Sequence, residues 1–120
     1  MTDFKQNLEK LGGYLDRFKG AGIQHRIGGE PVAAASQELF DSVSPVDGSV
    51  ICTVARGNAE DIARATAAAK AAFADWRDMP GTERKKILHR VADLIVARAD
   101  EIALLECWDT GQALRFMSKA

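Results

Sequence analysis

The chain has 120 residues, a length that suits one small domain or a part of a larger one. Its 16 basic and 17 acidic residues give a formal net charge of −1, which argues against nucleic acid or an anionic membrane surface as the main partner. No apolar run is long enough for a membrane span, and the first residues lack the apolar stretch of a signal peptide. Two cysteines do not make a disulfide framework, so a cytoplasmic protein with reduced thiols is expected.

The N-terminal segment has the spacing of an amphipathic helix, which we predict over Thr2 to Lys19 with Gly20 as its stop. Gly12 and Gly13 each weaken this helix by about 1 kcal/mol relative to alanine. We therefore expect it to dock on another element or to fray. Its apolar stripe consists of Phe4, Leu8, Leu11, Leu15 and Phe18.

Two β-hairpins are predicted next. Gln24–Ile27 and Glu30–Val32 flank the pair Gly28-Gly29, and glycine supplies the positive φ angles that a two-residue hairpin turn requires. A second hairpin is predicted within 40–55, with strands over 40–43 and 49–55. The turn sequence SPVDG joins them, and the second strand alternates in β-branched residues.

An alanine-rich helix is predicted from Asn58, as its N-cap, to Asp78. The acidic residues Glu60 and Asp61 lie in its first turn, where the helix dipole favours negative charge. Its predicted inner face, half of it alanine, indicates close packing with a neighbour. The face consists of Ile62, Ala65, Ala69, Ala72, Phe73 and Trp76.

The segment from Pro80 to Gly111 has a wide apolar stripe and a charged opposite face. We place Pro80 at the first helical position, which tolerates proline, and Gly111 at the helix stop. The stripe is interrupted at 98–100, so the segment is either two helices or one kinked helix. Its apolar positions are Ile87, Leu88, Val91, Leu94, Ile95, Ile102 and Leu105.

The last residues again have helical spacing, at Ala113, Phe116, Met117 and Ala120, and the sequence ends without a cap. We therefore expect the chain to be the N-terminal part of a longer polypeptide. Residues 1–20 are assigned to an N-terminal helical extension. Residues 21–120 are assigned to an incomplete domain.

The motif Asp-Thr-Gly at 109–111 occurs in aspartic proteases, but there the aspartate follows an apolar strand, and here it follows a helix. Cys52 and Cys107 have no histidine at a recognisable spacing, so we expect structural cysteines. His25 and His89 lack a second metal ligand at a suitable spacing and are expected to be surface or capping residues.

The basic cluster 84–90 is interpreted as a solvated helix face, because acidic residues are interspersed around it. Neither GxGxxG nor a P-loop is present, so the chain has no phosphate-binding loop of its own. From the residues alone, we expect no active site within these 120 residues.

The order of these elements resembles the N-terminal region of the aldehyde dehydrogenase superfamily. The resemblance rests on HRIGGEPV, then SPVDGSVICTVARG, then the Phe-x-x-Trp of Phe73 and Trp76, and then ECWDTG at 106–111. It implies an α/β fold, seen as α+β in this part: the hairpins and helices of a Rossmann-like NAD-binding domain. The leading helix, Ser44-Pro45 in place of Asn-Pro, and DTGQALRFMSKA resemble semialdehyde dehydrogenases of aromatic catabolism most closely.

The resemblance further implies an enzyme that oxidises a small-molecule aldehyde to a carboxylate with NAD or NADP, as a homodimer or homotetramer. In that family the nucleophile lies in Gly-Gln-x-Cys and the general base in Glu-Leu-Gly-Gly, and neither motif occurs here. No catalytic or cofactor-binding residue is therefore assigned in this chain, and we expect the 120 residues alone to be inactive.

One family site is expected to carry over, a structural Na⁺ or K⁺ held by a backbone carbonyl and an aspartate. The matching positions are Val43, with Ser42 beside it, and Asp109. The alternative is that Asp109 caps the following helix. For the whole chain, the alternative to an enzyme part is a small non-catalytic helical module that binds a partner protein through the same apolar faces.

Overall fold

The fold is described from a computed structural model, over residues 4–20 and 22–118. It is a mixed α and β structure, as the sequence predicts. Two pairs of strands precede the long helices, and short helices stand at either end of the described chain. In chain order the elements are α1 (Phe4–Leu15), the 3₁₀ helix η1 (Asp16–Phe18), β1 (His25–Ile27), β2 (Glu30–Val32), β3 (Leu39–Val43), β4 (Val50–Ala55), α2 (Ala59–Asp78), α3 (Gly81–Ala97), α4 (Ala99–Thr110) and α5 (Leu114–Met117).

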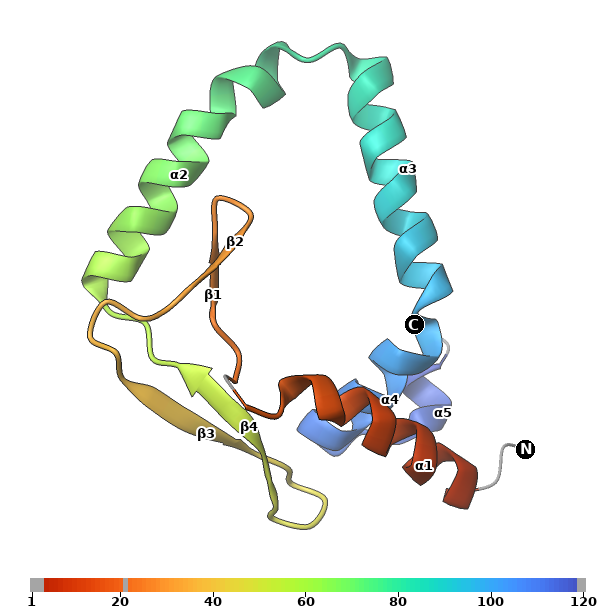
Figure 1. Cartoon of the computed structure of the whole chain (residues 1–120). Coiled ribbons are helices and arrows are strands. Elements are labelled where there is room, and N and C mark those ends of the chain that lie inside the picture. Colours follow the sequence, from red (N-terminus) through yellow and green to blue (C-terminus); the bar gives the residue numbers. More distant parts are fainter. Residues whose placement is uncertain (1–3, 21, 119–120) are drawn as a thin grey trace.

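The helices and strands form two regions (Figure 1). Helices α2 and α3 rise from the ends of β4 and α4 and meet at the top, and we call this pair the arch. Helices α1, α4 and α5 and the β3–β4 pair lie together below it, and we call them the base. The β1–β2 hairpin lies beside α2.

The base contains nearly all of the buried apolar residues. Leu11 of α1 is buried, as are Ala103 and Leu104 of α4. Lys10 Nζ of α1 lies 2.6 Å from Asp100 Oδ2 of α4, and Arg17 of η1, which follows α1 directly, pairs with Glu101 of α4. The N-terminal helix therefore docks on α4, as its apolar stripe predicts, although it begins at Phe4 and the predicted start, Thr2, lies outside the described residues.

The β1–β2 hairpin has the predicted turn. The strands are antiparallel with Ile27 opposite Glu30, and Gly28 and Gly29 have φ angles of 61° and 87°. Positive φ at both central positions is the type I′ arrangement whose twist matches that of the flanking strands.

The β3–β4 pair is also antiparallel, with a register shift between Ser42 and Val43. Ile23 extends it on the β4 side: its N–H donates to the Thr53 carbonyl at 2.8 Å, and its carbonyl accepts from the Ala55 N–H at 2.8 Å. This close approach depends on Gly22 (φ 69°), since a Cβ there would lie 2.3 Å from Thr53 Oγ1.

Helix α2 begins at the predicted N-cap with a full capping box. The Asn58 side chain accepts from the Glu60 and Asp61 N–H groups, and the Asp61 carboxylate accepts from the Asn58 N–H. These bonds satisfy N–H groups that would otherwise have no partner at the helix start.

The corner between α2 and α3 differs from the prediction. Pro80 is the N-cap and not the first helical residue: its ψ of 140° is extended, and Gly81 begins α3. Arg84 is not part of a solvated face either, because its Nη1 donates to the carbonyls of Trp76, Arg77 and Met79 at 2.7–3.2 Å. A guanidinium therefore caps the C-terminus of α2, where carbonyls lack helical partners.

The predicted interruption of the long stripe is a true break between helices. Arg98, with φ −115° and ψ 18°, ends α3 and precedes α4. Gly111 ends α4 in the left-handed conformation, as predicted. The last helix is the short α5, and Ala120, which we expected on its apolar face, lies outside the described residues.

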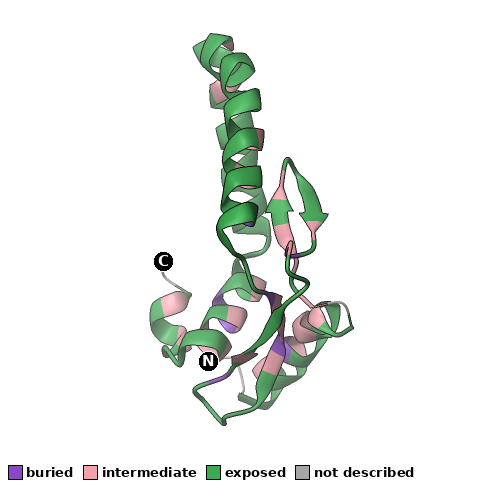
Figure 2. Cartoon of the chain, turned by 90° about the vertical axis from the view of Figure 1, so that its left-hand side faces the viewer, coloured by how far each residue is buried: buried purple, intermediate pink, exposed green. Residues whose placement is uncertain are grey.

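The arch leaves its apolar side chains exposed (Figure 2). Phe73 and Trp76 on α2 are 58% and 41% exposed, and α3 has no buried residue. The chain exposes 8882 Å², against about 6300 Å² for a folded monomer of its 13.0 kDa, an excess of about 2600 Å². Its radius of gyration is 17.5 Å, where about 13.6 Å is typical of this length. The predicted inner face of α2 therefore has no partner in the described chain.

Candidate functional site

The most specific polar cluster lies where the β3–β4 turn meets the end of α4. Ser44 is fully buried there: its Oγ donates to the Trp108 carbonyl at 2.6 Å and accepts from the Val46 N–H at 3.2 Å. Pro45 packs close to Gly111, where a Cβ would lie 3.3 Å from its Cγ. The serine that replaces the family asparagine thus fixes the turn to the helix.

The predicted cation ligands flank this junction. Ser42 Oγ donates to Asp109 Oδ1 at 3.1 Å, which joins β3 to the last turn of α4 across 67 positions in sequence. Val43 is the next residue, at the register shift, and is 51% exposed. The structure therefore brings Ser42 and Asp109 into contact and places Val43 beside them.

The donor chemistry suits a hard cation, because carboxylate, hydroxyl and carbonyl oxygens are the ligands that such ions prefer. No three side chains from His, Cys, Asp and Glu gather into a metal-binding group in the described part of the chain. A cation held by Asp109 and the Val43 carbonyl would therefore need further oxygen ligands.

The alternative role predicted for Asp109 is wrong. Helix α5 begins after Ala113, whose backbone is extended, and within residues 4–20 and 22–118 no side chain caps it. The Asp109 carboxylate instead accepts a hydrogen bond from Ser42, which lies back along the chain and not forward on α5. The reason is geometric: Gly111 turns the chain before the new helix starts.

Both cysteines have the character of structural thiols. Cys52 is buried on β4, and burial, followed by the negative charge of Asp109, raises its pKa. Burial and the charge of Glu106 likewise raise the pKa of Cys107. A thiol with a raised pKa is a poor nucleophile at neutral pH. Cys107 is half-buried and not fully buried as we expected.

The two histidines lie on different elements. His89 is exposed on α3. His25 is on β1, where its Nε2 lies 3.7 Å from Asp61 Oδ2 of α2. Neither belongs to a metal-binding group among the described residues. His25 is not the surface or capping residue that we expected, because its Nε2 is buried and makes no hydrogen bond within the described part of the chain.

The described residues do not form a dinucleotide-binding loop. The connection from β4 to α2 has the strand–turn–helix order of such a loop, but Asn58 and Asp61 already occupy the N–H groups at the helix start. The adjacent glycines, Gly28 and Gly29, lie in the hairpin turn and precede a strand. These residues do not fit the cofactor phosphates, so no step through a cofactor is derived for this chain.

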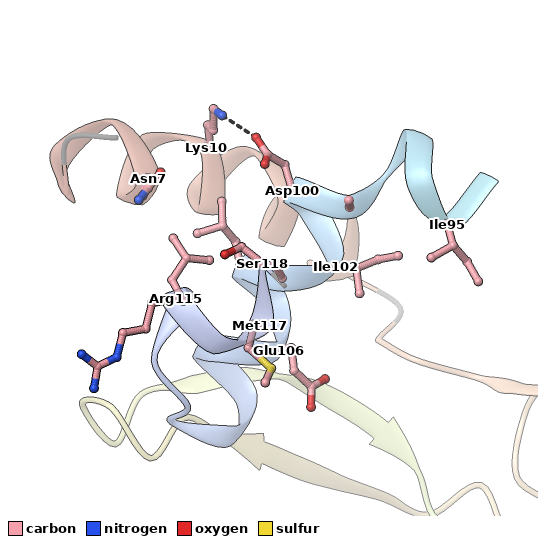
Figure 3. Close-up of a pocket in the computed structure, with 13 residues that line it drawn as sticks. Asn7, Lys10, Ile95, Asp100, Ile102, Glu106, Arg115, Met117 and Ser118 are labelled. Carbon is pink, nitrogen blue, oxygen red and sulfur yellow. Dashed lines mark hydrogen bonds and ion pairs between the residues drawn. The ribbon is translucent and has the colours of Figure 1, made fainter. Parts of the chain in front are cut away.

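A larger open hollow of about 810 Å³ lies among α1, α4 and α5 (Figure 3). Its rim carries the Lys10–Asp100 pair and Arg115, while Ile102 and Met117 contribute apolar surface. Charges of both signs surround it, and none of its described lining residues has a buried, unpaired polar group, so the hollow has no evident ligand chemistry. Sequence reasoning did not predict it, because it depends on how three separate helices pack.

None of the helices in the described part of the chain combines the length and apolar character that a membrane crossing demands.

Residues 31–120 match the aldehyde dehydrogenase family. Because this match covers most of the sequence, the chain belongs to that family.

Individual relatives agree with this assignment. The chain is 40% identical over 113 residues to the NADP/NAD-dependent aldehyde dehydrogenase PuuC of Escherichia coli (strain K12), covering 91% of this chain and 23% of that protein. It is 44% identical over 91 residues to the 2-hydroxymuconic semialdehyde dehydrogenase of Pseudomonas sp. (strain CF600), covering 75% of this chain and 19% of that protein.

The fold agrees as well. The crystal structure of HpcC from Thermus thermophilus superimposes with a TM-score of 0.88 at 38% identity, over 93% of this chain and 22% of that one. The mixed helix and strand fold is therefore that of the N-terminal part of these enzymes, as predicted. The chain spans about a fifth of the length of the relatives it matches.

Proposed function

We propose that these residues serve an NAD- or NADP-dependent enzyme that oxidises an aldehyde to a carboxylate. The match to the aldehyde dehydrogenase family over residues 31–120 carries the proposal. The PuuC relative, whose name specifies both NADP and NAD, supports the choice of cofactor class. The family resemblance further suggests a homodimer or homotetramer in the cytoplasm.

Within that enzyme, the role of these residues is scaffolding. Residues 21–120 belong to the N-terminal part of the NAD-binding domain, and residues 1–20 to an extension whose helix α1 packs on α4. The exposed apolar faces of α2 and α3 cover the dinucleotide-binding sheet. The excess surface of about 2600 Å² supports this, because it is the size of a large, permanent interface. We place the nucleophile and the general base outside these 120 residues, because neither Gly-Gln-x-Cys nor Glu-Leu-Gly-Gly occurs in them.

We further propose a semialdehyde of aromatic catabolism as the substrate, with 5-carboxymethyl-2-hydroxymuconate semialdehyde as the specific candidate. The N-terminal helix, Ser44-Pro45 and the DTGQALRFMSKA segment support this choice. The relative named for 2-hydroxymuconic semialdehyde supports the chemical class.

We also propose that Asp109 and the Val43 carbonyl contribute to a structural Na⁺ or K⁺ site in the whole enzyme. The support is the contact between Ser42 and Asp109 beside Val43. Melting temperatures in KCl, NaCl and choline chloride at equal ionic strength test this. Stabilisation by Na⁺ or K⁺ over choline should disappear in Asp109→Asn and persist in Asp47→Asn. Equal melting temperatures in all three salts would contradict the site.

The decisive experiment for the activity compares the product of the natural gene's complete reading frame with residues 1–120 alone. NADH and NADPH formation are followed with the 5-carboxymethyl semialdehyde, 2-hydroxymuconic semialdehyde and benzaldehyde. We expect turnover by the complete product, fastest with the first substrate, and none by residues 1–120. Aldehyde-dependent turnover by residues 1–120 would overturn the scaffolding role. Inactivity of the complete product on every aldehyde would overturn the enzymatic one and favour a protein-binding module.

A further inference from the structure

The β1–β2 hairpin contacts the start of the arch through His25. Its imidazole packs over Gly57, where a Cβ would come within 3.2 Å of Cε1. Its Nε2 lies 3.7 Å from Asp61 Oδ2, which is too far for a hydrogen bond. This nitrogen is shielded from solvent and has no hydrogen-bond partner among the described residues. A buried polar atom in this state costs free energy until it gains a partner.

The facing carboxylate of Asp61 already accepts hydrogen bonds from two segments, the start of α2 and the loop at Ala35. Asp61 is buried, and its carboxylate accepts from the Asn58 N–H at 3.1 Å and from the Ala35 N–H at 3.0 Å. Arg64 Nη1 donates to Oδ1 at 3.3 Å. Burial raises the pKa of Asp61, but the two backbone donors, His25 and Arg64 outweigh it, so the net pKa is lowered. The carboxylate is therefore ionised throughout the neutral pH range.

Few charged groups surround the imidazole. Helix α2 presents Asp61 and Arg64, as the contacts of the described residues show. On β2, the residue paired with His25 is the apolar Val32, and the 33–35 loop presents the Ala35 backbone to Asp61. In these contacts, the negatively charged group nearest to Nε2 is the Asp61 carboxylate, through Oδ2. Its other oxygen, Oδ1, already accepts a hydrogen bond from Arg64.

We propose that His25 and Asp61 form a proton-operated latch between the β1–β2 hairpin and the start of α2. A proton on Nε2 makes that nitrogen a donor toward Asp61 Oδ2, and a short movement across 3.7 Å closes an ion pair. In the neutral imidazole, even an Nε2–H facing Oδ2 lacks the attraction between opposite charges, so the hairpin is held less firmly. The latch therefore closes on the acidic side, where the imidazole is charged, and opens on the alkaline side, where it is neutral.

Amide hydrogen exchange of the full-length protein tests the latch at several pH values between about 5.5 and 8, with intrinsic rates corrected for pH. The reporters are the backbone amides of 25–30, of Val32 and of Ala35. We expect their protection to fall about fivefold as pH rises, the scale of one ion pair. His25→Gln should abolish this pH dependence. The matched control His89→Gln, on the exposed surface of α3, should keep it.

Protection that stays flat across this range in the wild type, or that keeps its pH dependence in His25→Gln, would overturn the latch. If His25→Gln does not fold, the ¹⁵N NMR chemical shifts of the His25 imidazole in the wild type still test the latch. A protonated His25 Nε2 hydrogen-bonded to a carboxylate at the acidic end supports the latch. A neutral imidazole throughout, or a protonated one without that hydrogen bond, contradicts it.

Discussion

The base and the arch are both built from amphipathic helices, yet only the base has a core. In the base, Leu11 of α1 is buried together with Ala103 and Leu104 of α4, the helix on which α1 lies. In the arch, α3 buries nothing and α2 buries only Asp61, a polar residue of its first turn. The comparison teaches that an apolar stripe predicts which face of a helix will pack. It does not predict which segment will cover that face.

Helix α2 of the arch is instead held at each of its own two ends by polar contacts. The capping box of Asn58 and Asp61 fixes the start of α2, and the Arg84 guanidinium fixes its end. Between them the helix is stabilised mainly by its own hydrogen bonds. Substitutions in the two regions should therefore have different costs.

The largest effect should come from a glycine of the base. In Gly22→Ala the new Cβ would lie 2.3 Å from Thr53 Oγ1 and 2.4 Å from the Thr53 carbonyl, at a φ of 69°. Left-handed strain and overpacking together should lower the free energy of unfolding by about 3–5 kcal/mol. Gly28→Ala is the matched control, because it has a similar φ and open space, and should lose about 1–2 kcal/mol. Urea denaturation measures both, and equal losses would contradict the packing of 22–23 on β4.

The next largest effect is the stability cost of shortening an apolar side chain, which should differ between the base and the arch. Leu104→Ala removes a buried side chain of the base and should cost about 2–4 kcal/mol in residues 1–120. Leu88→Ala, 58% exposed on α3, should cost about 0.5 kcal/mol or less in the same chain. In the complete enzyme, where we propose that α3 is covered, Leu88→Ala should become costly as well. Urea denaturation of both variants in both chains measures this, and a cost for Leu88→Ala that is the same in the two contexts would argue against a covered arch.

A smaller effect is expected at the top of the arch. Arg84→Ala leaves three carbonyls of α2 and its C-cap without their shared donor and should cost about 1–2 kcal/mol. Lys85→Ala, at an exposed neighbouring position, should stay within about 0.5 kcal/mol. Circular dichroism melting of the two variants measures the difference, and identical melting curves would show that the corner does not need the guanidinium.

The smallest effect should come from salt acting on the ion pairs of the base. The pair Lys10–Asp100 joins α1 to α4 with both side chains open to solvent, and Arg17 of η1 pairs with the more buried Glu101, so salt should screen the first pair more than the second. Protease cleavage after residues of α1 should become slightly faster in high salt. Cleavage in α3, whose ion pair Lys86–Glu83 stays within the helix, should not change. A strong salt effect on both regions would indicate that α1 docking controls the whole fold.

Local signals predicted most of the elements. The Gly28-Gly29 pair, the Asn58 cap and Gly111 each have a conformational reason that acts within a few residues, and each is found as predicted. The break at Arg98 was also visible as an interruption of the apolar stripe.

Contacts between segments that are distant in the sequence could not be predicted from residue patterns. The place of Arg84 depends on the angle between two helices, and the burial of Ser44 depends on a turn that meets the end of α4 64 positions later. For the same reason, Val43 and Asp109 were paired as cation ligands only through the family resemblance, and the hydrogen bond between Ser42 and Asp109 was not predicted. The role of Asp109 as a cap was mistaken because Gly111 turns the chain before α5.

The most direct test of the scaffolding role is hydroxyl-radical footprinting of Phe73 and Trp76, in residues 1–120 and in the product of the complete reading frame. Both side chains are exposed in the arch, at 58% and 41%, and aromatic rings of this size are normally covered in a finished fold. We predict strong labelling of both in residues 1–120 and protection of both in the complete enzyme, while the buried Leu104 is protected in each. Equal labelling of Phe73 and Trp76 in the two proteins would contradict the account.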